Sequence, residues 1–192
     1  MLYKSAAGIY DSFMAPMERA FLDRWRSEVA SLLPNGGLIL EVGAGTGLNF
    51  AHYPRCEHAV ASDYSAEMLA RARVKNSAPD LIRANAQALP FPDDKFDAAF
   101  ATLLFCSVAD PIAGFRELMR VVKPGGAIIL LEHVRPKGLL GYLFDVFNLA
   151  TVALIDDHFN RRTADLAKEA GINVEEVRSK AFGTVNLIVG KS

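Results

Sequence analysis

Short apolar runs alternate with helical patterns along most of this chain, and that alternation restricts the fold more than any other feature. Apolar runs of strand length occupy residues 38–42, 59–62, 81–84, 96–105 and 127–134, and two more strands are expected at 172–177 and 184–189. Helices are expected at 10–33, 65–75, 111–122 and 161–170. Strands that alternate with helices pair in parallel. The sequence therefore predicts an α/β fold with a doubly wound, mostly parallel sheet, helices on both faces and an antiparallel last strand.

Capping residues mark the ends of several of these helices. Ser65 is a candidate N-cap, and Asp110 with Pro111 opens the helix at 111–122. The stretch 123–126, Lys-Pro-Gly-Gly, is expected to end that helix, and Gly171 to end the last one. In the first helix, the apolar spacing predicts a buried face made of Met14, Met17, Phe21, Trp25, Val29 and Leu32.

Composition narrows the class of protein. The chain has 192 residues, the size of one domain, and a formal net charge of −1 without long basic runs, so nucleic acid is not expected as a partner. It has two cysteines without a Cys-x-x-Cys pair, which indicates neither a disulfide framework nor a zinc site. The N-terminus lacks the apolar region of a signal peptide, and no apolar run reaches the roughly 18 residues of a spanning helix. We expect a soluble cytoplasmic protein, at most peripheral at the inner membrane surface.

A glycine loop follows the first apolar run. Gly43, Gly45 and Gly47 give the spacing G-x-G-x-G, and such a loop lets a ligand approach the backbone. The dinucleotide fingerprint G-x-G-x-x-G would need glycine where the chain has Leu48, so a nicotinamide cofactor is disfavoured. A tight turn without any ligand is the alternative. About 20 residues further on, Asp63 ends the second strand, where a carboxylate binds ribose hydroxyls or simply caps a turn.

Five motifs in order resemble those of class I S-adenosylmethionine-dependent methyltransferases. They are 41–47 (EVGAGTG), Asp63 with 65–69 (SAEML), 85–92 (NAQALPFP), Phe96-Asp97 and 121–126 (VVKPGG). The resemblance covers about residues 38–134 and implies a Rossmann-like fold that binds S-adenosyl-L-methionine and releases S-adenosyl-L-homocysteine. It implies that the glycine loop holds the methionine part, Asp63 the ribose, Tyr64 and Met68 the adenine side, and that Thr102 and Leu103 lie beside the sulfonium. The full set of cofactor-binding residues that it implies is Glu41, Gly43, Ala44, Gly45, Gly47, Asn49, Asp63, Tyr64, Met68, Asn85, Ala86, Gln87, Thr102 and Leu103.

Further segments resemble one branch of that family, which contains alkyl-thiol, phospholipid and quinone methyltransferases. These segments are 50–54 (FAHYP), 102–108 (TLLFCSV) and 131–134 (LEHV). The resemblance implies a small lipophilic or amphiphilic acceptor, either an amine of phosphatidylethanolamine type or an alkyl thiol. A quinone ring carbon is the alternative acceptor, and a non-catalytic protein that binds S-adenosylmethionine is the alternative from another functional class. Human thiol enzymes of the branch carry a membrane anchor before the domain, and we expect none in this chain.

One domain is expected, divided into a cover helix (1–34), a cofactor-binding core (35–134), an apolar segment that covers the acceptor (135–160) and a C-terminal helix with a hairpin (161–192). Residues 138–155 read GLLGYLFDVFNLATVALI and account for much of the apolar excess. This segment is expected either to cover an apolar acceptor and touch a membrane surface, or to be a helix buried in the monomer or a dimer contact. The oligomeric state is not readable from the sequence.

Four residues are candidates for catalysis: His133, His158, Asp157 and Tyr10. The histidines and Asp157 are candidate bases or acceptor-orienting groups, although a lone histidine near a strand end is more often structural. Tyr10 lies in the first helix, which the family resemblance implies closes over the cofactor; core packing is the alternative. Cys106 is expected to pack rather than react, and His52, Cys56 and His58 straddle a helix end and a strand start, so no metal is expected.

Overall fold

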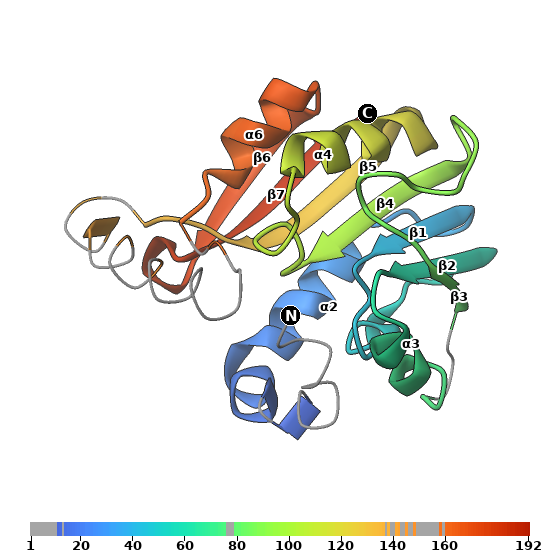
Figure 1. Ribbon diagram of the computed structural model, residues 1–192, viewed down its shortest axis with the longest axis horizontal. Coiled ribbons are helices and arrows are strands. Elements are labelled where there is room, and N and C mark those ends of the chain that lie inside the picture. The colour runs from blue at the N-terminus through green and yellow to red at the C-terminus, as the bar shows by residue number, and fades with distance from the viewer. Residues whose placement is uncertain are drawn as a thin grey trace.

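The computed structural model describes residues 11–12, 14–75, 79–136, 138, 141–142, 145, 148, 158 and 160–192. Its centre is a seven-stranded sheet with the strand order β3-β2-β1-β4-β5-β7-β6 (Figure 1). The strands are β1 (Leu38–Val42), β2 (His58–Asp63), β3 (Asp80–Arg83), β4 (Phe96–Thr102), β5 (Val122–His133), β6 (Asn173–Lys180) and β7 (Val185–Lys191). Neighbours from β3 to β5 pair in parallel, whereas β7 runs antiparallel to both β5 and β6. The predicted fold class is confirmed.

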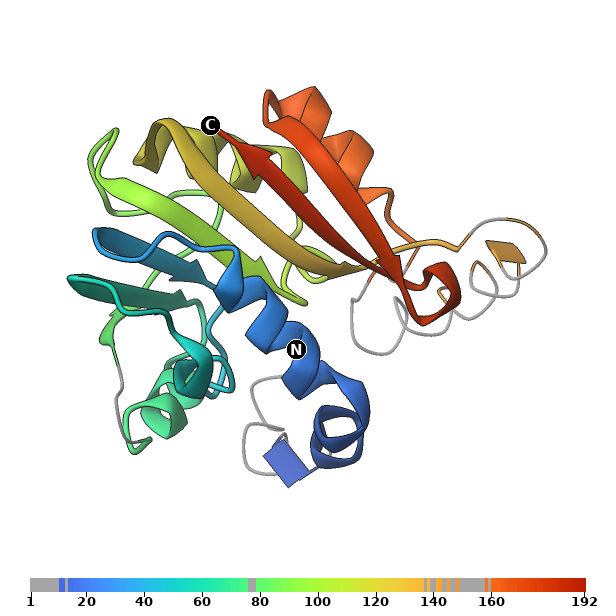
Figure 2. The ribbon, with the colours of Figure 1, turned by 180° about the vertical axis from the view of Figure 1, so that it is seen from behind.

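Helices cover both faces of this sheet (Figures 1 and 2). On one face, α4 (Pro111–Val121) and α6 (Thr163–Ala170) bury a core that includes Phe96, Phe115 and Leu130. On the other face, α2 (Asp23–Ser31) packs on β1, β4, β5 and β7, and α3 (Ala66–Ala72) contacts β2 and β3. Short 3-10 turns lie at η2 (Phe50–His52) and η3 (Ala181–Gly183). Alternate strand residues therefore face different helical layers, as expected for a sheet buried on both sides.

The predicted caps are present. Ser65 accepts a hydrogen bond from the amide of Met68, and Asp110 accepts one from the amide of Ala113. Gly171 ends α6 with a left-handed φ of 110°. Two strand boundaries were wrong. The strand expected at 96–105 ends at Thr102. The helix ends at Val121, within one residue of its predicted end, but Val122 and the Lys-Pro-Gly-Gly stretch form the start of β5 and not a separate turn. Val122 pairs with Phe96, and the register shift between Phe96 and Ala98 accommodates the irregular start of the strand.

The N-terminal helical segment contains a π-helical turn, η1 (Glu18–Leu22), in which the amide of Asp23 bonds to the carbonyl of Glu18. A π turn adds one residue to a helix, so every later side chain moves to the next position around it. The buried residues after the turn are accordingly Leu22, Arg26, Val29 and Leu33, whereas Phe21 is 38% exposed. Of the face predicted for a uniform α-helix over 10–33, Met14 and Val29 are buried, but Arg26 and not Trp25 is the residue buried at that turn.

Candidate functional site

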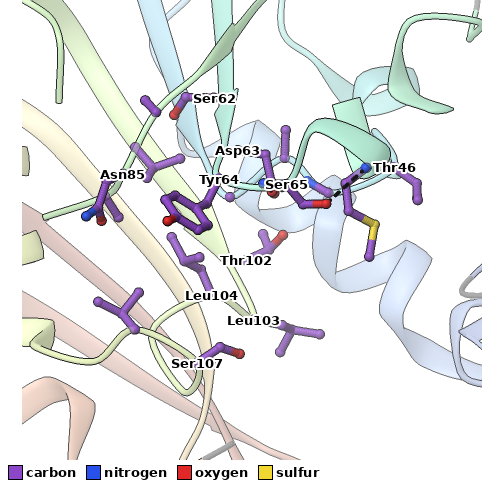
Figure 3. A pocket seen from close by; sticks show the side chains of 18 of the residues that line it. Thr46, Ser62, Asp63, Tyr64, Ser65, Asn85, Thr102, Leu103, Leu104 and Ser107 are labelled. Atoms are coloured by element: carbon purple, nitrogen blue, oxygen red, sulfur yellow. Dashed lines mark hydrogen bonds between the residues drawn. The ribbon is translucent and has the colours of Figure 1, made fainter. Parts of the chain in front are cut away.

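A pocket of about 570 Å³ lies at the carboxyl ends of β1, β2 and β4 (Figure 3). The sheet order changes direction between β1 and β4, and ligands of open α/β sheets bind at such a switch point. Predicted cofactor-binding residues that line the pocket are Gly43, Ala44, Gly45, Asp63, Tyr64, Met68, Asn85, Ala86, Gln87, Thr102 and Leu103. Other lining residues include Arg26, Thr46, Leu48, Leu104 and Ser107. Segments far apart in the sequence thus meet around one hollow.

Two glycines give the loop after β1 its shape. Gly43 has a φ of 77°, and a Cβ there would lie 2.7 Å from the side chain of Leu104, so a larger residue would strain the backbone and force Leu104 to move. Gly45 has a φ of 56°, but a Cβ there would meet no atom within 4 Å, since this residue faces the open pocket. In the part of the chain that the structure describes, the amides of Thr46 and Leu48 have no hydrogen-bond acceptor. The loop therefore offers free space and free amide donors to a ligand.

Asp63 joins this loop to the end of β2. Its carboxylate accepts hydrogen bonds from the amides of Gly45 and Ser65, both at 2.8 Å. Burial raises the pKa of Asp63, and the bonds from these two amides oppose that shift. Asp63 therefore caps this turn, which is one of the two roles that the sequence allowed. It does not exclude ligand binding, because each carboxylate oxygen has a second lone pair and Asp63 lines the pocket.

The far wall of the pocket is formed by loops after β3 and β4. Asn85 accepts a hydrogen bond from the amide of Gln87 at 3.0 Å, which fixes the turn after β3. Tyr64 is 61% exposed at the pocket and lies under the guanidinium of Arg83. Figure 3 shows Tyr64, Asn85 and Thr102 around the same hollow. A flat, partly aromatic wall of this kind suits a nucleobase.

The end of β4 is held in an unusual conformation. Leu103 has a φ of 54°, which costs a residue other than glycine about 1–2 kcal/mol. Its amide bonds to the carbonyl of Leu131 at 2.7 Å, and the fully buried Glu132 accepts from the amides of Leu104 and Phe105 at 3.0 and 3.1 Å. Glu132 thus positions the loop that lines the pocket. The sequence reading missed it, although a carboxylate inside an apolar strand is a signal that it needs partners.

Glu41, Asn49 and Gly47 were predicted to bind cofactor, but none of them is among the lining residues. Glu41 is fully buried and accepts hydrogen bonds from Asn49 at 2.5 Å and from the hydroxyl of Tyr53. Burial raises the pKa of Glu41, while these two donors lower it. Asn49 also donates to Thr102 Oγ1 at 2.8 Å. These residues support the pocket from behind, and Gly47 provides room for the ring of Phe50.

Arg26 is the functional residue that the sequence reading missed most clearly. It is 5% exposed, lines the pocket, and donates to Asn49 Oδ1 and Thr102 Oγ1, both at 2.9 Å. Glu18 pairs with it at 2.8 Å. No residue type singled out Arg26, because the same segment also carries Glu18, Asp23, Arg24 and Glu28. Reading it correctly required the π turn, which no residue pattern announced.

The predicted catalytic residues are only partly placed. Tyr10 and Asp157 lie outside the described residues. His133 ends β5, pairs with Val185 and does not line the pocket. The amide of His158 bonds to the carbonyl of Cys106 at 3.0 Å, one residue from the pocket-lining Ser107. The structure thus places the backbone of His158 near the pocket but does not bring His133 into its lining.

The apolar segment 138–155 lies mostly outside the described residues. Asp145 within it pairs with Arg135 at 2.7 Å and accepts a hydrogen bond from Asn160 at 3.2 Å. The segment is therefore tied at Asp145 to the chain after β5 and to the chain before α6. None of the described helices is both long and apolar enough to span a membrane. The described histidines, cysteines and acidic residues form no cluster of three or more that could hold a metal ion.

Comparison with known proteins agrees with this site. Residues 40–130 match the family model described as a methyltransferase domain. A phosphatidylethanolamine N-methyltransferase of Cereibacter sphaeroides is 37% identical over 122 residues, 60% of each chain. A demethylmenaquinone methyltransferase of Deinococcus radiodurans is 35% identical over 158 residues, 76% of this chain and 65% of the relative. This chain spans less than two thirds of either relative's length.

Among solved structures, an S-adenosylmethionine-dependent methyltransferase of Thermotoga maritima, described as a possible histamine N-methyltransferase, superposes with a TM-score of 0.70. It is 23% identical, and the match covers 96% of this chain and 98% of that one. That likeness shows the shared fold. The family match, which includes the glycine loop, Asp63 and β4, identifies residues 40–130 as a methyltransferase domain.

Proposed function

We propose that this chain transfers the methyl group of S-adenosylmethionine to a small lipophilic or amphiphilic acceptor. The observation that carries the proposal is the pocket in which Gly45, Asp63 and the turn at 85–87 meet the end of β4. Each part suits one part of that cofactor: open space and free amides for the amino acid, a carboxylate for the ribose hydroxyls, and a flat wall for the adenine. The residues present therefore fit S-adenosylmethionine.

Bound S-adenosylmethionine supplies an electrophilic methyl group on a positively charged sulfur. In the transfer, an electron pair of the acceptor would form the new bond to the methyl carbon, and the electrons of the broken carbon–sulfur bond would stay on sulfur. If the acceptor is a neutral amine, the methylated product is an ammonium ion, which then releases one proton to water or to a base. The contribution of the protein is then mostly positioning, since in-line geometry removes much of the entropic cost. We propose that Thr102, Leu103 and Leu104 provide the surface against which the acceptor approaches.

For the acceptor we favour an amine of phosphatidylethanolamine type, because the names of two relatives point to lipid-like substrates and one of them names this lipid. A quinone ring carbon is the second candidate, on the name of the Deinococcus radiodurans relative. An alkyl thiol stays a third class to be tested. Of the predicted bases we propose His158 before His133, since only His158 has its backbone next to the lining loop.

Transfer of radioactive methyl groups tests this proposal. Purified protein is incubated with labelled S-adenosylmethionine and, separately, with vesicles of phosphatidylethanolamine, a demethylated menaquinone and an alkyl thiol. Label in one extracted acceptor supports methyl transfer and identifies its class. Binding of S-adenosylhomocysteine without label in any acceptor favours the non-catalytic alternative. His158→Asn is expected to slow transfer to an amine with little effect on cofactor binding, and His133→Asn is the comparison.

A further inference from the structure

Arg26 is a buried cation with unused hydrogen-bonding capacity at the wall of the pocket. It is the only basic side chain among the described residues that line this pocket. Its relative exposure is 5%, so its charge is removed from bulk water. A buried charge needs partners, and a cavity beside it is a place where a charged ligand group can supply one.

The donors of this guanidinium can be counted. Nη1 gives both of its hydrogens, one to Asn49 and one to Thr102, each at 2.9 Å. Nε and one hydrogen of Nη2 go to the carboxylate of Glu18. A guanidinium has five N–H groups, so one hydrogen of Nη2 has no acceptor among the described residues. Because Arg26 lines the pocket, an acceptor that enters the pocket could take this hydrogen.

The local structure holds Arg26 in this orientation. The π turn at 18–22 moves the buried face of the helix by one residue and turns Arg26 toward the sheet. Glu18 at the start of that turn and Asn49 after the glycine loop then fix two sides of the guanidinium. Asn49 is itself held by Glu41 at 2.5 Å. The arginine is therefore preorganised, and binding an acceptor costs little side-chain entropy.

The surroundings indicate which acceptor fits. Arg26 contacts Thr102, at the end of β4, where the family resemblance places the methionine sulfonium, whereas Asp63 lies at the ribose position on β2. Thr46 and Leu48 also line this pocket, and their amides have no acceptor among the described residues. One cation with neighbouring free amides suits a carboxylate, and a charged hydrogen bond from arginine is stronger than a neutral one.

We infer that Arg26 recognises the α-carboxylate of the amino-acid part of the nucleoside ligand and so selects ligands that carry this group. The inference rests on the proposed function, since it assumes that S-adenosylmethionine occupies the pocket. It adds a residue from the N-terminal helix to a site otherwise built from strand ends. It also assigns a role to the π turn.

Calorimetric titration with three ligands tests this inference without measuring catalysis. The ligands are S-adenosylhomocysteine, its decarboxylated analogue and 5′-methylthioadenosine, which lacks the whole amino-acid part. The wild-type protein is expected to bind S-adenosylhomocysteine about 10- to 100-fold more tightly than the decarboxylated analogue, the range of a charged hydrogen bond. Arg26→Gln is expected to abolish most of that preference and to change the affinity for 5′-methylthioadenosine by less than about threefold.

Arg24→Gln is the matched control, because Arg24 lies on the same helix but is exposed. It should keep the full preference. Arg26→Lys keeps the charge and should retain part of the preference, which also serves if Arg26→Gln does not fold. An equal loss of affinity for all three ligands in Arg26→Gln would show that Arg26 only supports the fold. A wild-type protein that does not discriminate between the first two ligands would overturn the inference. If none of the three ligands binds, the proposed function is contradicted instead.

Discussion

The carboxylate of Asp63 accepts the amide hydrogen of Gly45 at 2.8 Å, so the end of β2 and the glycine loop after β1 form one unit. Asp63→Ala should therefore weaken binding of S-adenosylhomocysteine by about 1–3 kcal/mol, since it removes a ribose acceptor and leaves a loop amide unpaired. Calorimetry measures the change. Asp80→Ala, at an exposed aspartate on the neighbouring strand, is the control. Unchanged affinity in Asp63→Ala would place the ribose elsewhere.

Substitution of Gly45, with Gly36 as its matched control, tests the role of the glycine loop. Both have positive φ angles, 56° and 85°, and a Cβ on either would meet no atom within 4 Å. Alanine should thus strain each backbone to a similar extent, about 1 kcal/mol. Only Gly45 lines the pocket. Gly45→Ala should lower cofactor affinity at least about tenfold, 1.4 kcal/mol, and Gly36→Ala should leave it unchanged. Equal affinities in the two variants would mean that no ligand approaches the backbone at Gly45.

Glu132 should contribute to both stability and binding. Glu132→Ala leaves the amides of Leu104 and Phe105 without their buried acceptor, which costs about 1–3 kcal/mol of unfolding free energy. Urea denaturation measures this value, with the exposed Glu169→Ala as the control. Because the same loop lines the pocket, cofactor affinity should fall as well. A stable variant with normal affinity would show that other contacts hold the loop.

Asp97 makes stability depend on pH. Its carboxylate accepts from the amide of Leu38 at 2.7 Å and pairs with Lys123, and both interactions lower the pKa of Asp97 below its usual value. A lowered pKa means that the unfolded chain takes up the proton first as pH falls. The stabilisation is therefore present at neutral pH and is lost below about pH 4. Asp97→Asn should be less stable than wild type at pH 7, and the difference should shrink toward pH 3. A difference that does not vary with pH would exclude this ion pair as its source.

The strand and helix order could be predicted because it depends on local patterns. Apolar runs and capping residues such as Ser65 and Asp110 act over a few positions, so their positions in the sequence carry over to the structure. The boundary at Val122 could not be predicted in the same way. A Lys-Pro-Gly-Gly stretch is typical of a turn, and only pairing with Phe96, 26 residues away, brings it into β5.

Pocket residues could be predicted where the residue type itself indicates the local backbone conformation, as at Gly43, Gly45 and Asp63. Arg26 was not, because its burial depends on the π turn, and a shift of one residue changes which side chain faces inward. Glu41 and Asn49 show the opposite case. Both were predicted to bind the cofactor, but in this structure Asn49 bonds to Thr102 and Arg26 behind the lining, and Glu41 bonds to Asn49.

The most direct test of the account is calorimetric titration of the wild-type protein with S-adenosylmethionine and S-adenosylhomocysteine. We expect one binding site per chain for each ligand, mutual competition between the two, and no competition from nicotinamide adenine dinucleotide. Folded protein that binds neither ligand would contradict the central claim that the pocket around Gly45, Asp63 and Thr102 is a methyl-donor site.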